Sequence, residues 1–442
     1  KIFNVSGACE PGRHYMVALK PRLKEIRAMI DAGEYFTMNK ARQYGKTTIL
    51  RALTDFLKRD YIVVSMDFQR IGASKFKTEN IFSATFARDF IKKAEAGNQL
   101  EAEVLMPLKK VLEEQENRIE LYELFSCLIE ICAKAGKPVV LIIDEVDSAS
   151  NNQVFLDFLA QLRACYLDRD TTPTFWSVIL AGVYDIRNIR QKIRSDAEHK
   201  MNSPWNIAAK FQVDMSFSAQ EIAGMLKEYE ADYHTGMDIE KISQMIYAYT
   251  SGYPYLVSCL CKNMDEEVAG TEKFPDKSCA WTQAGFIEAV KLLINDNNTL
   301  FQSLTGKLAD YPELKNVVYE LLFTGRPIPY VPQNKYIDIA AMFGFIKNEK
   351  GTAVIANRIF ESVLYNLFIS EEFAASRMYD AGVQERNQFI VGGHLDVKRV
   401  LEKFVETFDY LYGDADETFL EDAGRRYFML FLKPIINGVG NS

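Results

Sequence analysis

The chain has 442 residues, of which 48% are hydrophobic and 25% charged, a composition typical of a globular protein with about two to four domains. Its formal net charge of −8 argues against a surface that coats nucleic acid generally, although a local basic groove stays open. No apolar run approaches the roughly 18–20 residues that cross a bilayer, so we expect no membrane partner.

Cysteine and histidine usage restricts the chemistry further. The seven cysteines form no C-x-x-C pair, and their odd number predicts reduced thiols and a cytoplasmic location. The four histidines lie far apart along the chain and lack the spacing of zinc ligands. We therefore expect neither a disulfide framework nor a zinc site.

The first half of the chain, residues 1–217, alternates short β-rich runs with helical patterns. That alternation is typical of an α/β fold in which helices cover both faces of a parallel sheet. The runs predict a five-stranded sheet, with strands at residues 35–39, 61–67, 139–143, 175–181 and 211–215. Helices are expected between them, for example at 48–58, 122–135 and 155–166, and a charged, mostly helical insertion occupies about residues 70–135.

In the second half, the strand-like runs stop at residue 218, and residues 218–305 have the pattern of amphipathic helices. Residues 306–370 add helices and then two short extended runs joined at 349–351, an order typical of a winged helix. Six basic and six acidic residues balance each other across 310–370, whereas a duplex-binding module usually has a basic excess. We expect a packing and relay module here, with a DNA-reading role as the alternative. Residues 371–442 are predicted to be a helical linker and the start of a further domain.

Residues 39–50, NKARQYGKTTIL, nearly match the phosphate-binding loop G-x-x-x-x-G-K-S/T. Gly45 would let the backbone approach the phosphates, Lys46 would neutralise the β- and γ-phosphates, and Thr47 would hold Mg²⁺. Lys40 replaces the first glycine, which shapes the turn rather than touching phosphate, so we expect this departure to be tolerated. The predicted strand before the loop and the helix after it supply the required context. The predicted nucleotide contacts are Arg42, Gln43, Tyr44, Gly45, Lys46, Thr47 and Thr48.

The stretch PVVLIIDEVD, residues 138–147, predicts a buried strand that ends in two carboxylates. Asp144 would join Thr47 in holding Mg²⁺, and Glu145 would polarise the attacking water. A strand that merely ends in solvated acids is the alternative for such a pair alone. Together with the loop, the pair predicts an ATP and Mg²⁺ site whose catalytic residues are Glu145, Lys46 and Asp144.

Six segments carry a resemblance to a known family: ARQYGKTT, LIIDEVD, VILAGVYDIRNIR, NSPWNIA, DMSFSAQEIAGML and TSGYPYLVSCLCK. They resemble the bacterial AAA-ATPase-like family, which is related to the archaeal-type ATPases and to the signal-transduction ATPases with numerous domains. The resemblance covers about residues 2–370. It implies a P-loop ATPase core at 1–217, a helical lid at 218–305 and a winged helix at 306–370.

Members of that family often continue into a nuclease-like domain of the PD-(D/E)xK type. The tail EDAGRRYFMLFLKPIINGVGNS is similar to the opening of that domain, with Glu421 as its only candidate acid. The tail stops before the strands that would bring the remaining metal-binding residues. We therefore expect no nuclease activity from this chain, and a nucleic-acid partner only through that domain.

The resemblance also implies roles around the nucleotide. Gly252 and Pro254 would close over the base or sugar, although a turn that starts a helix explains the same pair. The strand at 175–181 would lie between the loop strand and the Asp144 strand, and Tyr184 and Asp185, just beyond it, would face the γ-phosphate.

Two further groups are candidates with an open alternative. Arg187, Arg190 and Arg194 recur at helical spacing and would supply an arginine to a neighbouring subunit of a homo-oligomer, or else form a solvated helix face. The resemblance places adenine near 14–17, so Tyr15, Met16 and Val17 would line an apolar base pocket. Burial of the same residues in an N-terminal strand is the alternative.

The predicted function is an ATP-hydrolysing regulatory ATPase that acts as a nucleotide-dependent switch. Through the resemblance, its output would be the control of a C-terminal nuclease-like domain in a bacterial defence-type system. A DNA-binding initiator or loader that uses its winged helix on duplex is the runner-up. A third hypothesis is an ATP-binding scaffold that does not turn over.

Overall fold

The computed structural model describes residues 1–97, 100–114, 118–149, 152–183, 205–324, 326–372, 376–385, 389–391, 394–412, 424–433 and 435. The chain divides into two compact units, one of residues 1–247 with 252–289 and one of residues 248–251 with 290–442. Among the helices of this described part, none has the length and apolar character needed to cross a membrane. Each unit is described below by itself.

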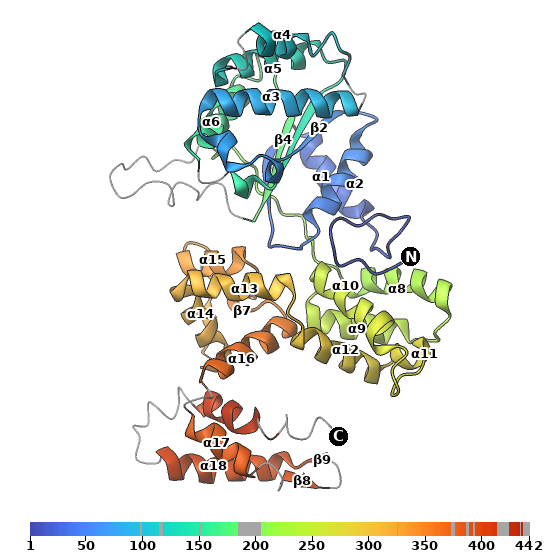
Figure 1. Cartoon of the computed structure of the whole chain (residues 1–442), viewed down its shortest axis with the longest axis vertical. Coiled ribbons are helices and arrows are strands. Elements are labelled where there is room, and N and C mark those ends of the chain that lie inside the picture. The colour runs from blue at the N-terminus through green and yellow to red at the C-terminus, as the bar shows by residue number, and fades with distance from the viewer. Residues whose placement is uncertain are drawn as a thin grey trace. The chain divides into compact units, whose positions relative to one another are not determined.

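A parallel sheet forms the centre of the first unit (Figure 1). Its four strands lie in the order β1-β4-β3-β2, so β4 lies between β1 and β3, as predicted. Every residue of β3 and β4 is buried, because helices cover both faces of the sheet. The strands are β1 (Tyr35–Asn39), β2 (Ile62–Asp67), β3 (Val139–Asp144) and β4 (Ser177–Gly182).

Alternate strand residues point to the two faces and create two hydrophobic cores. On one face α1 (Lys20–Asp31) and α2 (Lys46–Leu57) pack on side chains such as Val140 and Ile142. On the other face α3 (Glu79–Ala96), α5 (Leu121–Lys134) and α6 (Gln153–Leu167) pack on side chains such as Leu141 and Ile143 (Figure 1). The predicted α/β class is therefore confirmed. Shorter helical segments in this unit are η1 (Phe68–Arg70), η2 (Ala73–Phe76), α4 (Met106–Glu114) and η3 (Val146–Ser148).

The fifth strand predicted at 211–215 is wrong, because this segment makes no ladder in the structure. A single parallel bridge joins Phe36 to Ala209 at the β1 edge, and the chain then leaves the sheet. The carbonyl oxygens of Asp214 and Ser216 instead accept hydrogen bonds from the guanidinium of Arg22. This segment is therefore held by side-chain contacts, with Val213 and Met215 buried in the core, and not by a ladder.

The first unit continues into helices, and we call residues 219–247 and 252–289 the helical extension. Ser218 and Glu221 form a capping box that starts the first of these helices, α8. Tyr229 and Trp281 are buried and pack against each other, with ring centroids 4.7 Å apart. The helices from here to the start of the second unit are α8 (Ala219–Tyr233), α9 (Ile239–Thr250), α10 (Pro254–Lys262), the π-helical η5 (Asn263–Val268), α11 (Lys277–Ala280) and α12 (Gln283–Asn295).

The second unit contains helices and a small antiparallel sheet of order β5-β7-β6. The two extended runs predicted on either side of residues 349–351 pair as β6 (Ile346–Glu349) and β7 (Thr352–Ile355). Lys350 and Gly351 both have positive φ, 51° and 88°, as a tight two-residue hairpin turn requires. The other elements are α13 (Thr299–Asp310), α14 (Pro312–Phe323), β5 (Ile328–Pro329), α15 (Lys335–Met342), α16 (Arg358–Glu372), α17 (Arg377–Glu385), β8 (Ile390–Val391), β9 (His394–Leu395) and α18 (Val397–Tyr412).

Gly252 and Gly45 have similar φ angles but different surroundings, so we expect their changes to alanine to cost different amounts of stability. Gly252 has φ +73°, and a Cβ there would lie 1.9 Å from the carbonyl oxygen of Phe217. Gly45 has φ +80°, and a Cβ there would meet nothing within 4 Å. Gly45→Ala should therefore lower the unfolding free energy by roughly 1–2 kcal/mol through backbone strain alone. Gly252→Ala should add an overlap cost of about 1–3 kcal/mol. Equal melting temperatures of the two variants would contradict this contact.

Candidate nucleotide-binding site

The predicted loop connects β1 to α2 and has two left-handed residues. Gln43 has φ 56° and Gly45 has φ 80°, whereas Lys40 does not have a positive φ. The backbone N–H of Lys40 donates to the carbonyl of Gly182 over 3.2 Å and extends the pairing of β1 with β4. A glycine is therefore not needed at position 40, which gives a physical reason for the departure from the usual pattern.

Lys46 folds back over the loop as the first residue of α2. Its side chain is buried, with the residue 6% exposed, and Nζ donates to the carbonyl oxygens of Lys40 (2.8 Å) and Ala41 (3.0 Å). Burial lowers the pKa of Lys46, while the charges of Glu145, Asp147 and Asp144 oppose that shift. An ammonium has three N–H donors, and the third finds no acceptor within the described part of the chain. Since no described carboxylate forms an ion pair with Lys46, its charge is available to an anion.

The first turn of α2 offers backbone amides to the same anion. The helix begins directly after Gly45, and no side chain caps its N-terminus. Uncapped N–H groups and the positive end of the helix dipole favour a phosphate at this place. The hydroxyl of Thr48 is already used, because it accepts a hydrogen bond from the backbone N–H of Cys9 over 3.0 Å. Cys9 is a neighbour of the site that the sequence pattern did not indicate.

Thr47 and Asp144 meet although they lie 97 residues apart in the sequence. The hydroxyl of Thr47 donates to Oδ2 of Asp144 over 2.9 Å, and Oδ1 accepts from the backbone N–H of Glu145. Burial raises the pKa of Asp144, and these two hydrogen bonds oppose the shift. Both residues line the end of a groove between α2, β2 and α3. One hydroxyl and one carboxylate suit Mg²⁺, which usually keeps several waters and takes few protein ligands.

Glu145 follows β3 in a left-handed conformation, with φ 54°. A non-glycine residue pays about 1–2 kcal/mol of strain there. Its carbonyl accepts from the Oγ of Ser148, whereas its carboxylate makes no hydrogen bond or ion pair with a residue that the structure describes. Burial and the neighbouring charge of Asp144 raise the pKa of Glu145. The carboxylate is therefore half-buried and available to accept a proton from water.

Asp147, which the sequence pattern left without a role, secures the end of the sheet. Its Oδ2 accepts the backbone N–H of Val183 over 2.6 Å, just beyond β4. A Cβ at Gly182 would lie 2.7 Å from Oδ1 of Asp147, so this approach needs a residue without a side chain. The carboxylate thus fixes the turn after β3 to the end of β4. The spacing of three residues after Asp144 is the only signal for it in the sequence.

Gly252 and Pro254 have a structural explanation in the fold. The carbonyl of Gly252 accepts the N–H of Phe217 over 2.8 Å, and Pro254 is the first residue of α10. This matches the alternative of a turn that starts a helix, and contact with base or sugar stays a prediction. Tyr253, between them, faces the loop: its hydroxyl donates to the carbonyl of Arg42, and its ring lies 4.5 Å from that of Tyr44. Nothing in the local pattern indicated this contact.

Tyr15 and Val17 are buried, and Met16 is partly exposed. The hydroxyl of Tyr15 donates to Asp232 over 2.7 Å, and its ring packs against Phe3 at 5.0 Å. Burial and the bond to Asp232 raise the pKa of Tyr15. The ring is therefore packed in the interior, but residues 15–19 form no strand, so the alternative holds for the burial and not for the strand. Contact of this segment with adenine stays a prediction.

Six predicted residues lie outside the part of the chain that the structure describes. They are the residues expected to face the γ-phosphate, the three arginines expected to act on a neighbouring subunit, and the acid of the nuclease-like tail: Tyr184, Asp185, Arg187, Arg190, Arg194 and Glu421. Their roles stay predictions.

Comparisons with known proteins agree with the motifs. The Walker-type ATPase PABY2304 of Pyrococcus abyssi is 14% identical, with a TM-score of 0.55 over 82% of this chain and 99% of that chain. The Orc2 protein of Aeropyrum pernix in its ADP form is 12% identical over 85% of this chain and 98% of that chain, with a TM-score of 0.42. The Cdc6p protein of Pyrobaculum aerophilum is 14% identical over 84% of this chain and 97% of that chain, with a TM-score of 0.38. The first likeness shows a shared P-loop ATPase fold, and the other two are too distant to carry an argument.

No curated protein matches the chain. A family model described as an AAA-like domain matches residues 14–360, which is more than half of the chain. The loop before α2 and the carboxylates after β3 both lie inside that match. The chain therefore belongs to the AAA-like domain family.

Proposed function

We propose that the protein binds ATP with Mg²⁺, hydrolyses ATP, and uses this cycle as a regulatory switch. The observation that carries the proposal is the buried ammonium of Lys46, which has two carbonyl partners and no carboxylate partner among the described residues. A buried ammonium that forms no direct ion pair is costly even with carboxylates in its neighbourhood, so the site favours an anionic ligand that contacts Lys46. The uncapped N-terminus of α2 next to it favours the same ligand.

Each residue of the loop has a separate task in this proposal. The amides at the start of α2 hold phosphate oxygens, and Lys46 neutralises the β- and γ-phosphates. Thr47 and Asp144 would hold Mg²⁺, which when bound neutralises developing charge on the transferred phosphoryl group. The 2.9 Å hydrogen bond between Thr47 and Asp144 brings the two oxygens together, which supports this assignment.

Glu145 is the residue that we propose to orient and deprotonate the attacking water. Burial and the charge of Asp144 raise the pKa of Glu145, which makes its carboxylate a better proton acceptor than an ordinary one. Because the carboxylate has no partner among the described residues, a water bound to it competes with no internal bond. The left-handed backbone fixes the direction in which the side chain leaves β3.

The remaining chain supplies the parts that a switch needs. We propose that residues 218–305, which include the helical extension, form the lid and that residues 306–370 form a winged helix, with the core ending near 217. The hairpin β6–β7 after α15 supports that assignment. The balance of six basic and six acidic residues across 310–370 supports a relay role rather than duplex binding. The resemblance of residues 421–442 supports a nuclease-like domain as the element that the switch controls.

The two lysines of the loop provide a matched test of nucleotide binding. Lys46→Ala should abolish binding of ATP with Mg²⁺, since it removes the buried charge that faces the phosphates. Lys40→Gly should keep the affinity within about tenfold, or ~1.4 kcal/mol, because position 40 contributes its backbone to the sheet. Titration calorimetry measures both variants against the wild type. An unchanged dissociation constant for Lys46→Ala would show that the loop is not the site.

Glu145→Gln tests turnover separately from binding. The amide keeps the size of the side chain but cannot accept the proton of the attacking water, so ATP should still bind. Hydrolysis should fall by roughly 10²–10⁴-fold, the usual worth of a general base. Single-turnover phosphate release gives the rate, and calorimetry gives the affinity of the same variant. Equal rates for variant and wild type would leave Glu145 without a catalytic role and favour a scaffold that does not turn over.

A further inference from the structure

Two tyrosines connect the phosphate-binding loop to the helical extension. The hydroxyls of Tyr44 and Ser216 lie 2.8 Å apart in a hydrogen bond, and the hydroxyl of Tyr253 donates to the carbonyl of Arg42. The two rings pack edge to face, with centroids 4.5 Å apart at an angle of 65°. Tyr253 is 3% exposed, and burial raises its pKa well above the ordinary value, so its hydroxyl remains a donor.

A backbone hydrogen bond connects these contacts into one closed network. Phe217 follows Ser216, Gly252 precedes Tyr253, and the N–H of Phe217 donates to the carbonyl of Gly252 over 2.8 Å. The close approach leaves no room for a Cβ at Gly252. We call the members of this network the clasp: Arg42, Tyr44, Ser216, Phe217, Gly252 and Tyr253.

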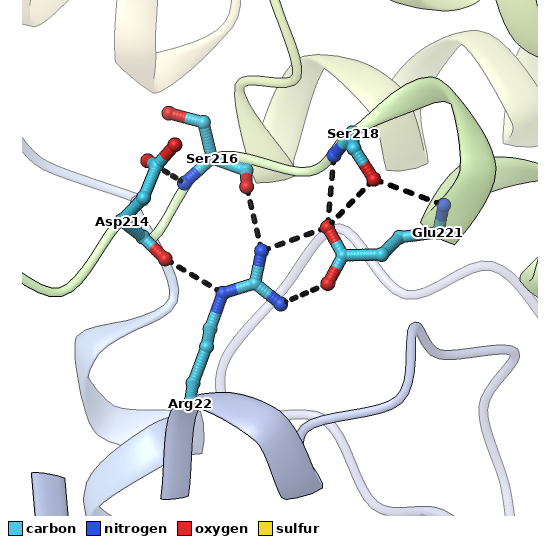
Figure 2. A network of polar contacts seen from close by, with 5 residues as sticks. All are labelled: Arg22, Asp214, Ser216, Ser218 and Glu221. Carbon is cyan, nitrogen blue, oxygen red and sulfur yellow. Dashed lines mark hydrogen bonds and ion pairs between the residues drawn. The ribbon is translucent and has the colours of Figure 1, made fainter. Parts of the chain in front are cut away.

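Arg22 fixes the segment in which Ser216 lies to the core of the unit (Figure 2). Its Nε donates to the carbonyl of Asp214 (2.8 Å) and its Nη2 to the carbonyl of Ser216 (2.6 Å). The same guanidinium pairs with both carboxylate oxygens of Glu221, in the first turn of α8. Burial alone would raise the pKa of Glu221, but the bonds from Arg22 and Ser218 outweigh it and lower that pKa. The entry into the helical extension is thus held by one buried side chain of α1.

The clasp holds the loop immediately before the residues that would bind phosphate. Arg42 and Tyr44 precede Gly45 and Lys46 by only a few positions, so an anion that reorganises the loop backbone moves the clasp partners as well. A buried partner left without its hydrogen bond costs about 1–3 kcal/mol, which favours joint movement over separation. We propose that the clasp transmits the occupancy of the loop to the helical extension, with Tyr44 and Tyr253 as positioning residues. This inference rests on the proposed nucleotide binding and assigns its route within the chain.

Hydrogen–deuterium exchange of the full chain tests the route in the wild type. The probes are ADP and an ATP analogue with a non-hydrolysable β–γ bridge, each with Mg²⁺. Both should protect residues 40–48. The analogue should slow exchange in 214–222 and 252–262 about fivefold more than ADP, equivalent to roughly 1 kcal/mol. Protection of the loop without any response in these two segments would overturn the inference. No protection of the loop by either probe would instead overturn the proposed function.

The double variant Tyr44→Phe/Tyr253→Phe removes two hydroxyls and keeps both rings. The difference between the probes in 214–222 and 252–262 should disappear. The single variant Tyr253→Phe leaves the predicted nucleotide contact Tyr44 unchanged, so it should lose the same difference while both probes still protect the loop. Tyr247→Phe is the matched control, because Tyr247 lies on α9 and is 43% exposed. It should respond like the wild type.

Ser216→Ala removes the hydroxyl that is hydrogen-bonded to Tyr44 and leaves both tyrosines unchanged. It should reduce the difference in exchange between the two probes in 214–222 and 252–262. This single change keeps the inference testable if the double variant does not fold. A full response in the folded double variant, or in Ser216→Ala, would show that the clasp only packs the interior.

Discussion

The candidate site depends on three parallel strands that end at one edge of the sheet. β4 pairs with β1 on one side and β3 on the other, with Asn39 opposite Gly182 and Ile143 opposite Leu180. This register brings the loop after β1 next to the acids after β3. The contact of Thr47 with Asp144 across 97 residues is a consequence of strand order rather than of any local preference. Asp147 maintains the geometry by holding the end of β4.

Charge balance explains why such a site would take nucleotide and cation together. Burial lowers the pKa of Lys46 and raises the pKa values of Asp144 and Glu145, so each of these groups is costly to keep charged. A polyphosphate alone would compensate Lys46 but would repel the two acids. Mg²⁺ held by Asp144, as proposed above, would offset that repulsion, because it would add positive charge where the carboxylates lie. The nucleotide and the cation are therefore expected to bind as a unit.

The sequence predicted the parts of the fold that are encoded locally. The buried runs of β3 and β4, the order loop–helix and the hairpin turn at Lys350 and Gly351 all follow from periodicity or from residue type. The absence of a fifth strand could not be foreseen from the local sequence. The carbonyls of Asp214 and Ser216 are bound by Arg22, which lies almost two hundred residues earlier in the chain. The contact of Tyr253 with the loop could not be predicted either, because its partner Arg42 is also distant in the sequence. The expected tolerance of Lys40 could be argued from the pattern, and the structure adds a physical reason for it, because Lys40 does not have a positive φ.

The replacement of a strand by a side-chain network has a mechanical consequence. A β-ladder between 211–215 and β1 would have fixed the chain to the sheet through several backbone bonds. Among the described residues one bridge, at Ala209, joins this part of the chain to β1. Beyond it the attachment consists of the bonds from Arg22, the bond between Tyr44 and Ser216, and the packing of Val213 and Met215 in the core. Removing one member of a buried ion pair costs about 3–5 kcal/mol, because the other charge is left buried and unpaired, so Arg22 and Glu221 are expected to stay together. The polar part of this attachment is concentrated in a few bonds with defined geometry, and one of them, between Tyr44 and Ser216, reaches the loop directly. We therefore expect this connection to respond to a change in the loop more readily than a β-ladder would, because a ladder shares a local disturbance among many equivalent bonds.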